Sequence, residues 1–450
     1  MVMKLRKYID TYSDFRFIIE NLELESSFSK QILLEKPFLT NKKEIENQYY
    51  RIKSLLNSIS RIDFLLNDFK REKHRLCELR DIRGTISRLE SGAILDDIEL
   101  FELKSLALTS SKINTLLLEY KLDEFTTITI DQVLSLLDPE GKNIGSFYVY
   151  DSYSQELREL RSKYKQNPED SDLLDAVFNK ESEIRASISK EISKDVELIK
   201  EVLFSLAELD ILIAKTLQIV EFKLTIPKIE DGLLCYQNMF HPKVEASLLM
   251  ENKQFQPINI KLDNMLPVLI TGANMGGKSV VLKTLALNQI LFQFGFGIPA
   301  ESAQISIVES IHFCSGDDQN IDKGLSSFAA EILKINKVLE EIRRGKRILA
   351  LIDEPARTTN PEEGTALTES LVDMLKQKNV LSVVTTHYNV SNNKCLRYRV
   401  KGIENGKMNY TLTETDTHFV PKEAINIART LGVDEEWVSK TEEILSLKQK

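Results

Sequence analysis

The stretch LPVLITGANMGGKS (Leu266–Ser279) sets the architecture of the second half of the chain, because it reads as a buried strand, a glycine-rich loop and a helix start. Its last eight residues fit the pattern G-x-x-x-x-G-K-[ST], whose backbone N–H groups surround phosphate oxygens. Gly272, Gly276 and Gly277 would let the backbone approach a phosphate without an obstructing Cβ atom. The stretch therefore predicts a nucleotide-binding loop.

Two side chains at the end of this loop would complete phosphate binding. Lys278 would reach the β- and γ-phosphates, and the Ser279 hydroxyl would ligate Mg²⁺. The helix that follows would add the partial positive charge of its N-terminus. The alternative is a glycine-rich turn with an incidental lysine, and partners further along the chain argue against it.

These partners lie at the ends of two later apolar runs. RILALIDE (Arg347–Glu354) ends in two acids. Asp353 would hold Mg²⁺, and Glu354 would orient or deprotonate the attacking water. The next run, NVLSVVTTH, ends in His387, which would sense the γ-phosphate through a hydrogen bond. The alternatives are an acid pair that caps the next turn and a structural histidine.

Short apolar runs alternate with helical patterns throughout the second half, with helices expected over residues 279–292, 326–343 and 364–376. This alternation predicts an α/β P-loop domain with a mainly parallel sheet covered by helices. After this alternation in the sequence, YRVKGIENGKMNYTLT reads as a hairpin around Glu404-Asn405-Gly406. Two helices separated by Gly432 are expected at the end of the chain.

The first half has a different composition, since only Gly84, Gly92, Gly141 and Gly145 of the 17 glycines precede residue 232. Turn-forming residues are few in this half. Apolar residues recur there at three- and four-residue steps, as in residues 42–69, and both features predict long helices.

A helical hairpin is predicted over residues 152–166 and 172–222, with Pro168 in its turn. Its second limb would run about 50 residues, or roughly 75 Å if unbroken. The segment SFYVYDS (Ser146–Ser152) alternates and is aromatic, which predicts a strand or hairpin before the arm.

These patterns divide the chain into four parts. We expect a helical core domain over residues 1–145, a helical arm or lever over 146–231, a P-loop ATPase domain over 232–420 and a C-terminal helix pair over 421–450. The fold class is therefore an α/β ATPase domain preceded by an all-α core and lever domain.

Composition limits the class of protein. Four scattered cysteines without a C-x-x-C pair argue against a zinc site and favour a reducing cytoplasm. We expect neither a membrane segment nor a signal peptide, because no apolar run is long enough. The net charge of −9 is unlike the basic excess of an obligate nucleic-acid binder. A basic run over residues 70–88 is the best candidate for a local basic face that contacts nucleic acid, and the alternative is a solvated helix face, because acids are interleaved in the run.

Read together, these motifs resemble the MutS family of ABC-type ATPases. The resemblance covers roughly residues 241–445 and includes TGANMGGKS, FGIPAESAQI, DDQNIDKGLSSFAAEI, LIDEPARTTNPEEG and the strand end TTH. It implies Mg²⁺-dependent ATP hydrolysis by a dimer whose two sites are each built from both subunits. The C-terminal segment resembles the family's terminal helix pair, which implies a role in dimerisation, either with itself or with a related subunit.

The resemblance also assigns further residues. The helix start at Gly324, Ser326 and Ser327 would face the γ-phosphate held by the other subunit. In the nucleotide site, Asn274 matches the family's P-loop asparagine, and Phe255 matches the aromatic position that stacks on adenine. Arg357 and Thr359 lie in the turn after the acids, which signals between the two sites.

Two departures from the family pattern concern function. From the length of the chain we expect neither the family's mismatch-reading and connector domains nor a small nuclease domain at its end. In the turn after Glu354, Pro355-Ala-Arg-Thr-Thr-Asn-Pro361 replaces a glycine-rich sequence, and proline fixes φ near −65°. The stiffer turn implies a differently tuned signal between the two sites.

Three functions stay open. The first is a protein-remodelling ATPase, since the short architecture looks like the MutS-related subunit of the reactivase for adenosylcobalamin-dependent lysine aminomutases. The second is a DNA-binding ATPase of mismatch repair or recombination control, acting on duplex or branched DNA. The third is a scaffold that binds ATP without turnover, against which Lys278, Asp353 and Glu354 count.

Overall fold

The computed structural model describes residues 3–60, 73–272, 277–315, 327–391, 394–404, 407–416, 425, 428–429 and 432–448. Its contacts divide the chain into two compact units. The sheet unit comprises Met1–Asn21, Pro37–Tyr50 and Gln218–Lys450, and the helical unit comprises Leu22–Lys36 and Arg51–Leu217. The four domain boundaries expected above stay predictions.

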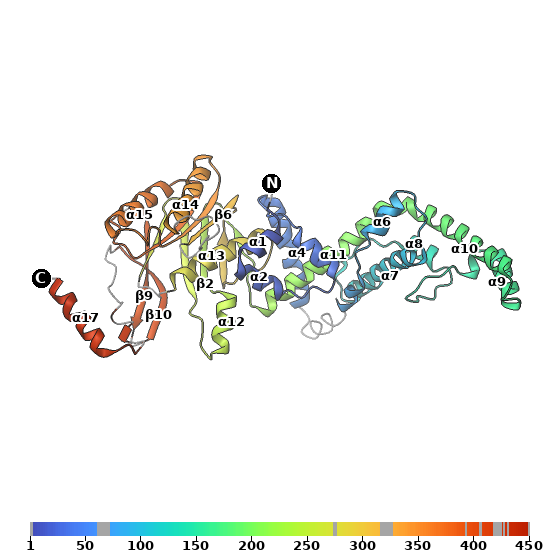
Figure 1. The fold of residues 1–450 in the computed structure, drawn as a ribbon, viewed down its shortest axis with the longest axis horizontal. Helices are drawn as coiled ribbons and strands as arrows, with labels where there is room; N and C mark the ends of the chain where they lie inside the picture. Colours follow the sequence, from blue (N-terminus) through green and yellow to red (C-terminus); the bar gives the residue numbers. More distant parts are fainter. Residues whose placement is uncertain are drawn as a thin grey trace. The chain divides into compact units, whose positions relative to one another are not determined.

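The centre of the sheet unit is a six-stranded sheet in the order β10-β9-β4-β8-β7-β6 (Figure 1). Neighbouring strands from β9 to β6 are parallel, and β10 pairs antiparallel with β9 at one edge. This confirms the mainly parallel sheet. Its strands are β4 (Val268–Thr271), β6 (Ser310–Ser315), β7 (Ile348–Asp353), β8 (Val380–Thr386), β9 (Leu396–Glu404) and β10 (Lys407–Glu414).

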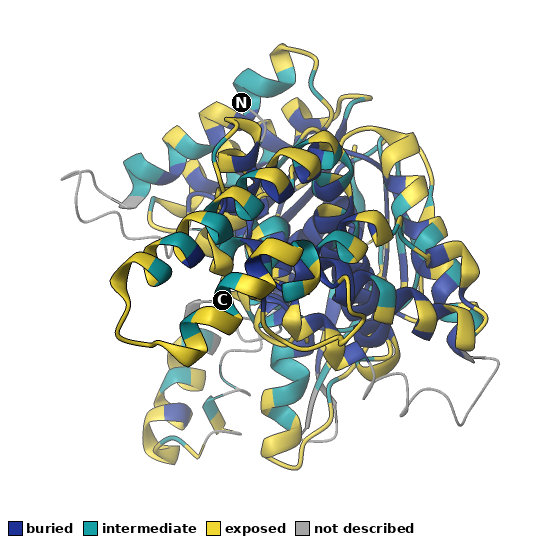
Figure 2. Cartoon of the chain, turned by 90° about the vertical axis from the view of Figure 1, so that its right-hand side faces the viewer, coloured by how far each residue is buried: buried dark blue, intermediate teal, exposed yellow. Residues whose placement is uncertain are grey.

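Every residue of β4, β7 and β8 is buried. Figure 2, coloured by burial, shows that the outer helices carry exposed and buried residues along their length. Strands without polar alternation are expected where helices cover both faces of a parallel sheet. The helices are α13 (Lys278–Gln293), α14 (Ser327–Arg343) and α15 (Pro361–Leu375). Side chains from α14, α15 and the strands form one core cluster that includes Val338, Ile352 and Leu371. Helix α15 starts earlier than predicted, because Asn360 caps it and Pro361 takes its first position.

A second, four-stranded sheet in the order β1-β5-β2-β3 belongs to the same unit and was not predicted. Its strands are β1 (Lys228–Ile229), β2 (Leu233–Met239), β3 (Ile258–Asp263) and β5 (Ser302–Ile305), with α12 (Pro242–Met250) between β2 and β3. The N-terminal helices α1 (Leu5–Thr11) and α2 (Ser13–Glu20) also belong to the sheet unit, where Tyr8 and Phe15 each pack against Phe294.

The helical unit is built mainly from α3 (Ser27–Leu34), α6 (Arg83–Glu90), α7 (Asp97–Glu119), α8 (Asp131–Leu137), α9 (Gln155–Gln166) and α10 (Ser171–Ile192), with 3₁₀ turns η1 (Lys73–Glu78), η2 (Asp123–Phe125), η3 (Asp151–Tyr153) and η4 (Ser193–Asp195). Two helices cross the division between the units, α4 (Lys42–Ser60) and α11 (Val196–Glu221). No helix among the described residues is long and apolar enough to cross a membrane.

The predicted helical hairpin is confirmed, with α9 and α10 in contact and Asp170 capping α10. Its long second limb is not one helix, because the 3₁₀ turn η4 separates α10 from α11. The strand predicted at Ser146–Ser152 is wrong. This segment is irregular and leads into η3. The buried Tyr150 side chain anchors it through a hydrogen bond from its hydroxyl to Asp138, and the Ser146 carbonyl oxygen accepts from Lys104 Nζ at 3.3 Å instead of from a neighbouring strand.

Two predicted features at the end of the chain fall partly outside the described residues. The hairpin is confirmed as β9 and β10, with Glu404 opposite Lys407, while residues 405–406 at its tip are not described. The second terminal helix is α17 (Glu435–Lys448). Most residues of the first terminal helix lie outside the described part.

Candidate active site

The glycine-rich loop leaves the end of β4 and enters α13, as the sequence predicts. Gly272 has φ 143°, and a Cβ atom there would lie 3.1 Å from the Val400 side chain. Gly277 has φ 77° at the N-cap of α13, a left-handed conformation that side chains other than glycine rarely adopt. Both positions therefore need glycine. Asn274 and Gly276 lie outside the described residues.

Lys278 is the first residue of α13, and its side chain is buried. The Nζ atom donates to the Gly272 carbonyl oxygen at 2.9 Å, which folds the lysine back over its own loop. The same nitrogen lies 3.2 Å from Oε1 of Glu354. The lysine and the second acid predicted from the sequence are thus brought together at the N-terminus of one helix, where partial positive charge favours anions.

Ser279 and Asp353 also meet, since the Ser279 Oγ donates to Oδ2 of Asp353 at 2.6 Å. The other oxygen, Oδ1, accepts a hydrogen bond from Thr385 Oγ1 at 2.6 Å. The register of β7 and β8, which sets Asp353 opposite Thr385, fixes this second contact. The sequence singles out the strand end TTH that contains Thr385, but only His387 is given a specific role there. The contact of Thr385 with Asp353 depends on the register of the two strands, which is not readable from one strand alone.

A hydroxyl and a carboxylate are the hard oxygen donors that Mg²⁺ prefers. Among the described residues, no group of three or more His, Cys, Asp or Glu side chains could hold a metal ion. The hydroxyl of Ser279 and the carboxylate of Asp353 would suit a Mg²⁺ ion that takes its remaining ligands from phosphate oxygens and water.

Glu354 begins the turn after β7 with φ 48°, a left-handed conformation that is uncommon outside glycine. Its N–H group points at Thr385, with the carbonyl oxygen at 3.2 Å and Oγ1 at 2.9 Å. Its carboxylate lies between two cations, Lys278 and the Arg357 guanidinium, whose nearer nitrogen is 3.8 Å away. The predicted base is therefore held beside the phosphate-binding loop.

His387 follows β8 and lies in the same charge cluster. Burial lowers the pKa of His387, Glu354 acts in the opposite direction, and Lys278 and Arg357 lower it further. The net effect is a pKa below the usual 6.5, so the imidazole is neutral at pH 7. Its Nδ1 atom is buried and has no hydrogen-bond partner within the described part of the chain.

An aromatic residue approaches the loop from the second strand of the predicted hairpin, where no site residue was expected. A Cβ atom at Gly277 would lie 3.1 Å from the Tyr410 ring, so this tyrosine of β10 packs on the loop. The backbone N–H of Tyr410 donates to the Gln256 side chain at 2.7 Å, next to the half-buried Phe255. The segment that carries Phe255 is thereby tied to β10 beside the loop.

The remaining predicted residues are only partly placed. Thr359 donates from its hydroxyl to Glu363 at 3.3 Å, within the turn and the first helical turn of α15. Gly324 and Ser326 lie outside the described residues. Ser327 is the first residue of α14, and its side chain is not described.

Comparison with known proteins agrees with this geometry. Residues 268–438 match the family model for MutS domain V. MutS domain V is an ATPase domain. The chain therefore contains an ATP-binding, MutS-like ATPase domain, and this region includes all of the site described above except Phe255 and Gln256.

Similar proteins match a longer part of this chain than the family model does. Endonuclease MutS2 of Caldanaerobacter subterraneus subsp. tengcongensis is 32% identical over 303 residues, covering 65% of this chain and 35% of the relative. Endonuclease MutS2 of Finegoldia magna is 32% identical over 277 residues, covering 58% and 34%. That of Fusobacterium nucleatum is 34% identical over 248 residues, covering 53% and 31%. The matched part thus spans about a third of the length of these relatives.

Proposed function

We propose that this chain is a dimeric, ATP-driven switch that hydrolyses ATP with Mg²⁺ at the site around Lys278 and Glu354. The observation that carries the proposal is the convergence of two pairs at the carboxyl ends of parallel strands. These pairs are Ser279 with Asp353 at 2.6 Å and Lys278 with Glu354 at 3.2 Å. The carboxyl edge of an α/β sheet is also where such folds bind their ligands.

The pairing of Lys278 with Glu354 suggests how ATP binding would prepare hydrolysis. The γ-phosphate competes with Glu354 for the Lys278 ammonium, since both are anions within reach of the same nitrogen. The freed carboxylate then accepts a proton from the attacking water. Neutral His387 donates a hydrogen bond to the γ-phosphate, and Ser279 and Asp353 would hold Mg²⁺, which supplies charge stabilisation when bound.

Further residues would complete the site. The backbone of Gly272, Gly276 and Gly277 would surround the phosphates, with Asn274 beside them. Adenine would stack on Phe255. In the dimer, the Gly324–Ser327 helix start of one subunit would face the γ-phosphate of the other, and Arg357 and Thr359 would pass the state of one site to its neighbour. The C-terminal helix pair would support dimerisation.

The ATPase proposal is tested by replacing the loop lysine. Lys278→Ala should abolish measurable ATP binding and turnover, because the principal cation for the β- and γ-phosphates is removed. Lys283→Ala is the matched control, since Lys283 is exposed on the same helix. Equal ATP affinity and turnover in Lys278→Ala and Lys283→Ala would contradict the proposal.

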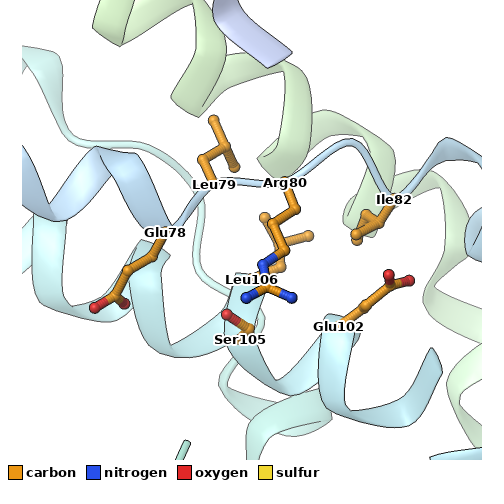
Figure 3. A pocket seen from close by; sticks show the side chains of 7 residues that line it. All are labelled: Glu78, Leu79, Arg80, Ile82, Glu102, Ser105 and Leu106. Carbon is orange, nitrogen blue, oxygen red and sulfur yellow. The ribbon is translucent and has the colours of Figure 1, made fainter. Parts of the chain in front are cut away.

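We propose a protein as the client of this switch, and an adenosylcobalamin-dependent aminomutase is the candidate that the family resemblance offers. The supporting observation is the charge pairing of the basic run in the helical unit. Arg83 lies 2.6 Å from Asp81, and Arg88 lies 3.2 Å from Glu99. Arg80 points at α7 between Glu78 and Glu102, beside a small cavity (Figure 3). Paired cations leave little net charge for a phosphate backbone.

DNA is the second candidate, and the names of the relatives favour it, since each is an endonuclease MutS2. A titration with duplex and branched DNA at increasing salt, with and without ATP, separates the two. Electrostatic contact with phosphates gives affinity that falls steeply with salt. Such a slope would overturn the protein-client proposal, while absence of binding at low salt together with co-purification of an aminomutase would support it.

A further inference from the structure

The turn that follows the two acids has an unusual backbone at Ala356. This residue has φ 60°, and Glu354 two positions earlier has φ 48°. Left-handed conformations at residues other than glycine cost energy and persist only where surrounding contacts enforce them. Because Pro355 lies between the two, the direction of the Glu354 side chain depends on what holds the Ala356 peptide groups.

Two buried side chains hold Ala356 from different elements. The Ala356 N–H donates to Oε1 of Glu331, one turn into α14, at 3.1 Å. The Ala356 carbonyl oxygen accepts the Tyr388 hydroxyl at 2.8 Å and the Thr359 N–H at 3.2 Å. Glu331 is buried, and this burial raises the pKa of its carboxyl group even though the Ala356 N–H favours the charged form.

Helix α15 leaves space for this arrangement at one position. A Cβ atom on Gly364 would lie 2.4 Å from the Tyr388 hydroxyl and 2.6 Å from the ring carbon that bears it. A larger residue would therefore push the tyrosine ring away from Ala356. Side chains from α14 and from the segment after β8 thus hold the two peptide groups that flank the Ala356 Cα atom, and α15 leaves room for one of these side chains.

We propose that Glu331 and Tyr388 are positioning residues that orient the general base Glu354 by holding Ala356 at its N–H and its carbonyl oxygen. The inference rests on the proposed function, because it presupposes that Glu354 activates water. Neither side chain needs to touch the nucleotide. Since α14 carries Glu331, a shift of α14 moves Ala356 and changes where the Glu354 carboxylate points.

The test compares kcat with ATP affinity in variants of the full chain. Glu331→Ala and Tyr388→Phe each remove one hydrogen bond to Ala356, and each should lower kcat at least tenfold while the ATP Kd stays within about threefold. Displacing a catalytic group by about 1 Å can cost about 100-fold in rate. Glu331→Gln keeps a side-chain oxygen that can accept from the Ala356 N–H, so it should restore most of the lost rate.

Two further variants separate positioning from general damage to the fold. Gly364→Ala should resemble Tyr388→Phe, because it displaces the same ring. Glu340→Ala, on the same helix as Glu331, should keep the kcat of the parent chain, since its carboxylate contacts the side chains of Asn336 and Arg344. Thermal unfolding of each variant would check that the compared proteins are folded. Tyr388→Phe removes only a hydroxyl and should perturb the fold less than Glu331→Ala.

The outcomes distinguish this inference from the proposed function. Parent-like kcat in both Glu331→Ala and Tyr388→Phe would overturn the positioning role, and so would a loss of ATP affinity as large as the loss of kcat. Full turnover in Glu354→Gln would instead overturn the assignment of the base. A reduced kcat with retained ATP affinity, rescued by Glu331→Gln, would support the proposal.

Discussion

Two buried lysines, Lys278 in the sheet unit and Lys104 in the helical unit, each lie against a carboxylate, yet the surroundings of the two pairs differ in kind. Lys104 Nζ lies 3.4 Å from Asp138 and 3.0 Å from the Tyr150 hydroxyl. Its side chain is fully buried, and that of Lys278 is 4% exposed. Burial alone therefore does not separate a structural pair from a functional one.

The partners of the two carboxylates do separate them. Asp138 accepts from the backbone N–H groups of Lys142 and Asn143 at 3.2 and 2.6 Å, and from the Tyr150 hydroxyl at 3.0 Å. Burial would raise the pKa of Asp138, but these bonds and Lys104 lower it overall. Fixed donors within its own unit thus stabilise this carboxylate.

Glu354 is paired differently, with the ends of two long cationic side chains, Lys278 and Arg357. Such side chains can turn toward a phosphate, whereas the backbone donors around Asp138 cannot leave it. A Lys–carboxylate pair thus stabilises the fold when fixed donors complete the hydrogen bonds of the carboxylate. Such a pair can take part in catalysis when the lysine can leave the carboxylate and bind a phosphate instead.

The largest expected effect on stability is at the structural pair. Lys104→Met should lower the free energy of unfolding by about 3–5 kcal/mol, because a buried carboxylate loses its counter-charge. ATP turnover per folded molecule should not change. Urea titration of the purified chain measures the loss. Lys112→Met on the same helix is the control, since its pair with Glu78 is exposed and should cost no more than about 1 kcal/mol.

The next largest effect is expected at Thr385, which donates a hydrogen bond to Asp353, and it concerns the Mg²⁺ requirement of ATP hydrolysis. Thr385→Val removes the hydroxyl that donates to Asp353 and accepts from the Glu354 N–H. The Mg²⁺ concentration for half-maximal ATPase activity should rise about 10–100-fold, as for other residues that orient a metal ligand. Ser382→Ala in the same strand should leave this concentration unchanged; an equal rise in both variants would refute the role of Thr385.

A smaller effect is expected from pH. Because the pKa of His387 is lowered below 6.5, the folded protein keeps this imidazole neutral through pH 7. The unfolded chain binds the proton more readily, so the contribution of His387 to stability falls as pH drops below about 6.5. Turnover should be level between pH 7 and 8 and fall by up to about tenfold per unit below the folded pKa. Rate profiles of the parent chain and His387→Asn check this, and identical acid limbs would contradict it.

The smallest effect is expected at an exposed pair. Lys440 and Glu436 lie 2.6 Å apart in α17, with side chains 67% and 77% exposed. Solvent screens such pairs, and holding two long side chains in place costs entropy. Lys440→Ala should leave the thermal unfolding midpoint within experimental scatter. A shift as large as that of Lys104→Met would show that proximity, rather than burial with fixed donors, sets the strength of these pairs.

The sequence predicts the parts of the site that lie within continuous motifs. Gly272, Lys278, Ser279, Asp353 and Glu354 fall where strand–loop–helix patterns put them, because each motif carries its own local geometry. The parallel sheet follows from the same alternation of buried strands and helices, and so does the α9–α10 hairpin from its turn residues.

Contacts between distant segments are not predictable in this way. Thr385 meets Asp353 through strand register, Glu331 and Tyr388 reach Ala356 from separate elements, and Tyr410 reaches the loop from the edge strand. The aromatic segment before the arm shows the converse error. An alternating pattern predicts a strand, but buried hydrogen bonds of Tyr150 hold the segment without strand pairing.

The central claim, that Glu354 is an exchangeable partner of Lys278 and the base for hydrolysis, is tested most directly by ATP binding and turnover of Glu354→Gln. We predict that this variant binds ATP with a Kd within about threefold of the parent chain, while kcat falls about 10²–10⁴-fold, the usual contribution of a general base. Turnover at the parent rate, or loss of ATP binding together with turnover, would contradict it.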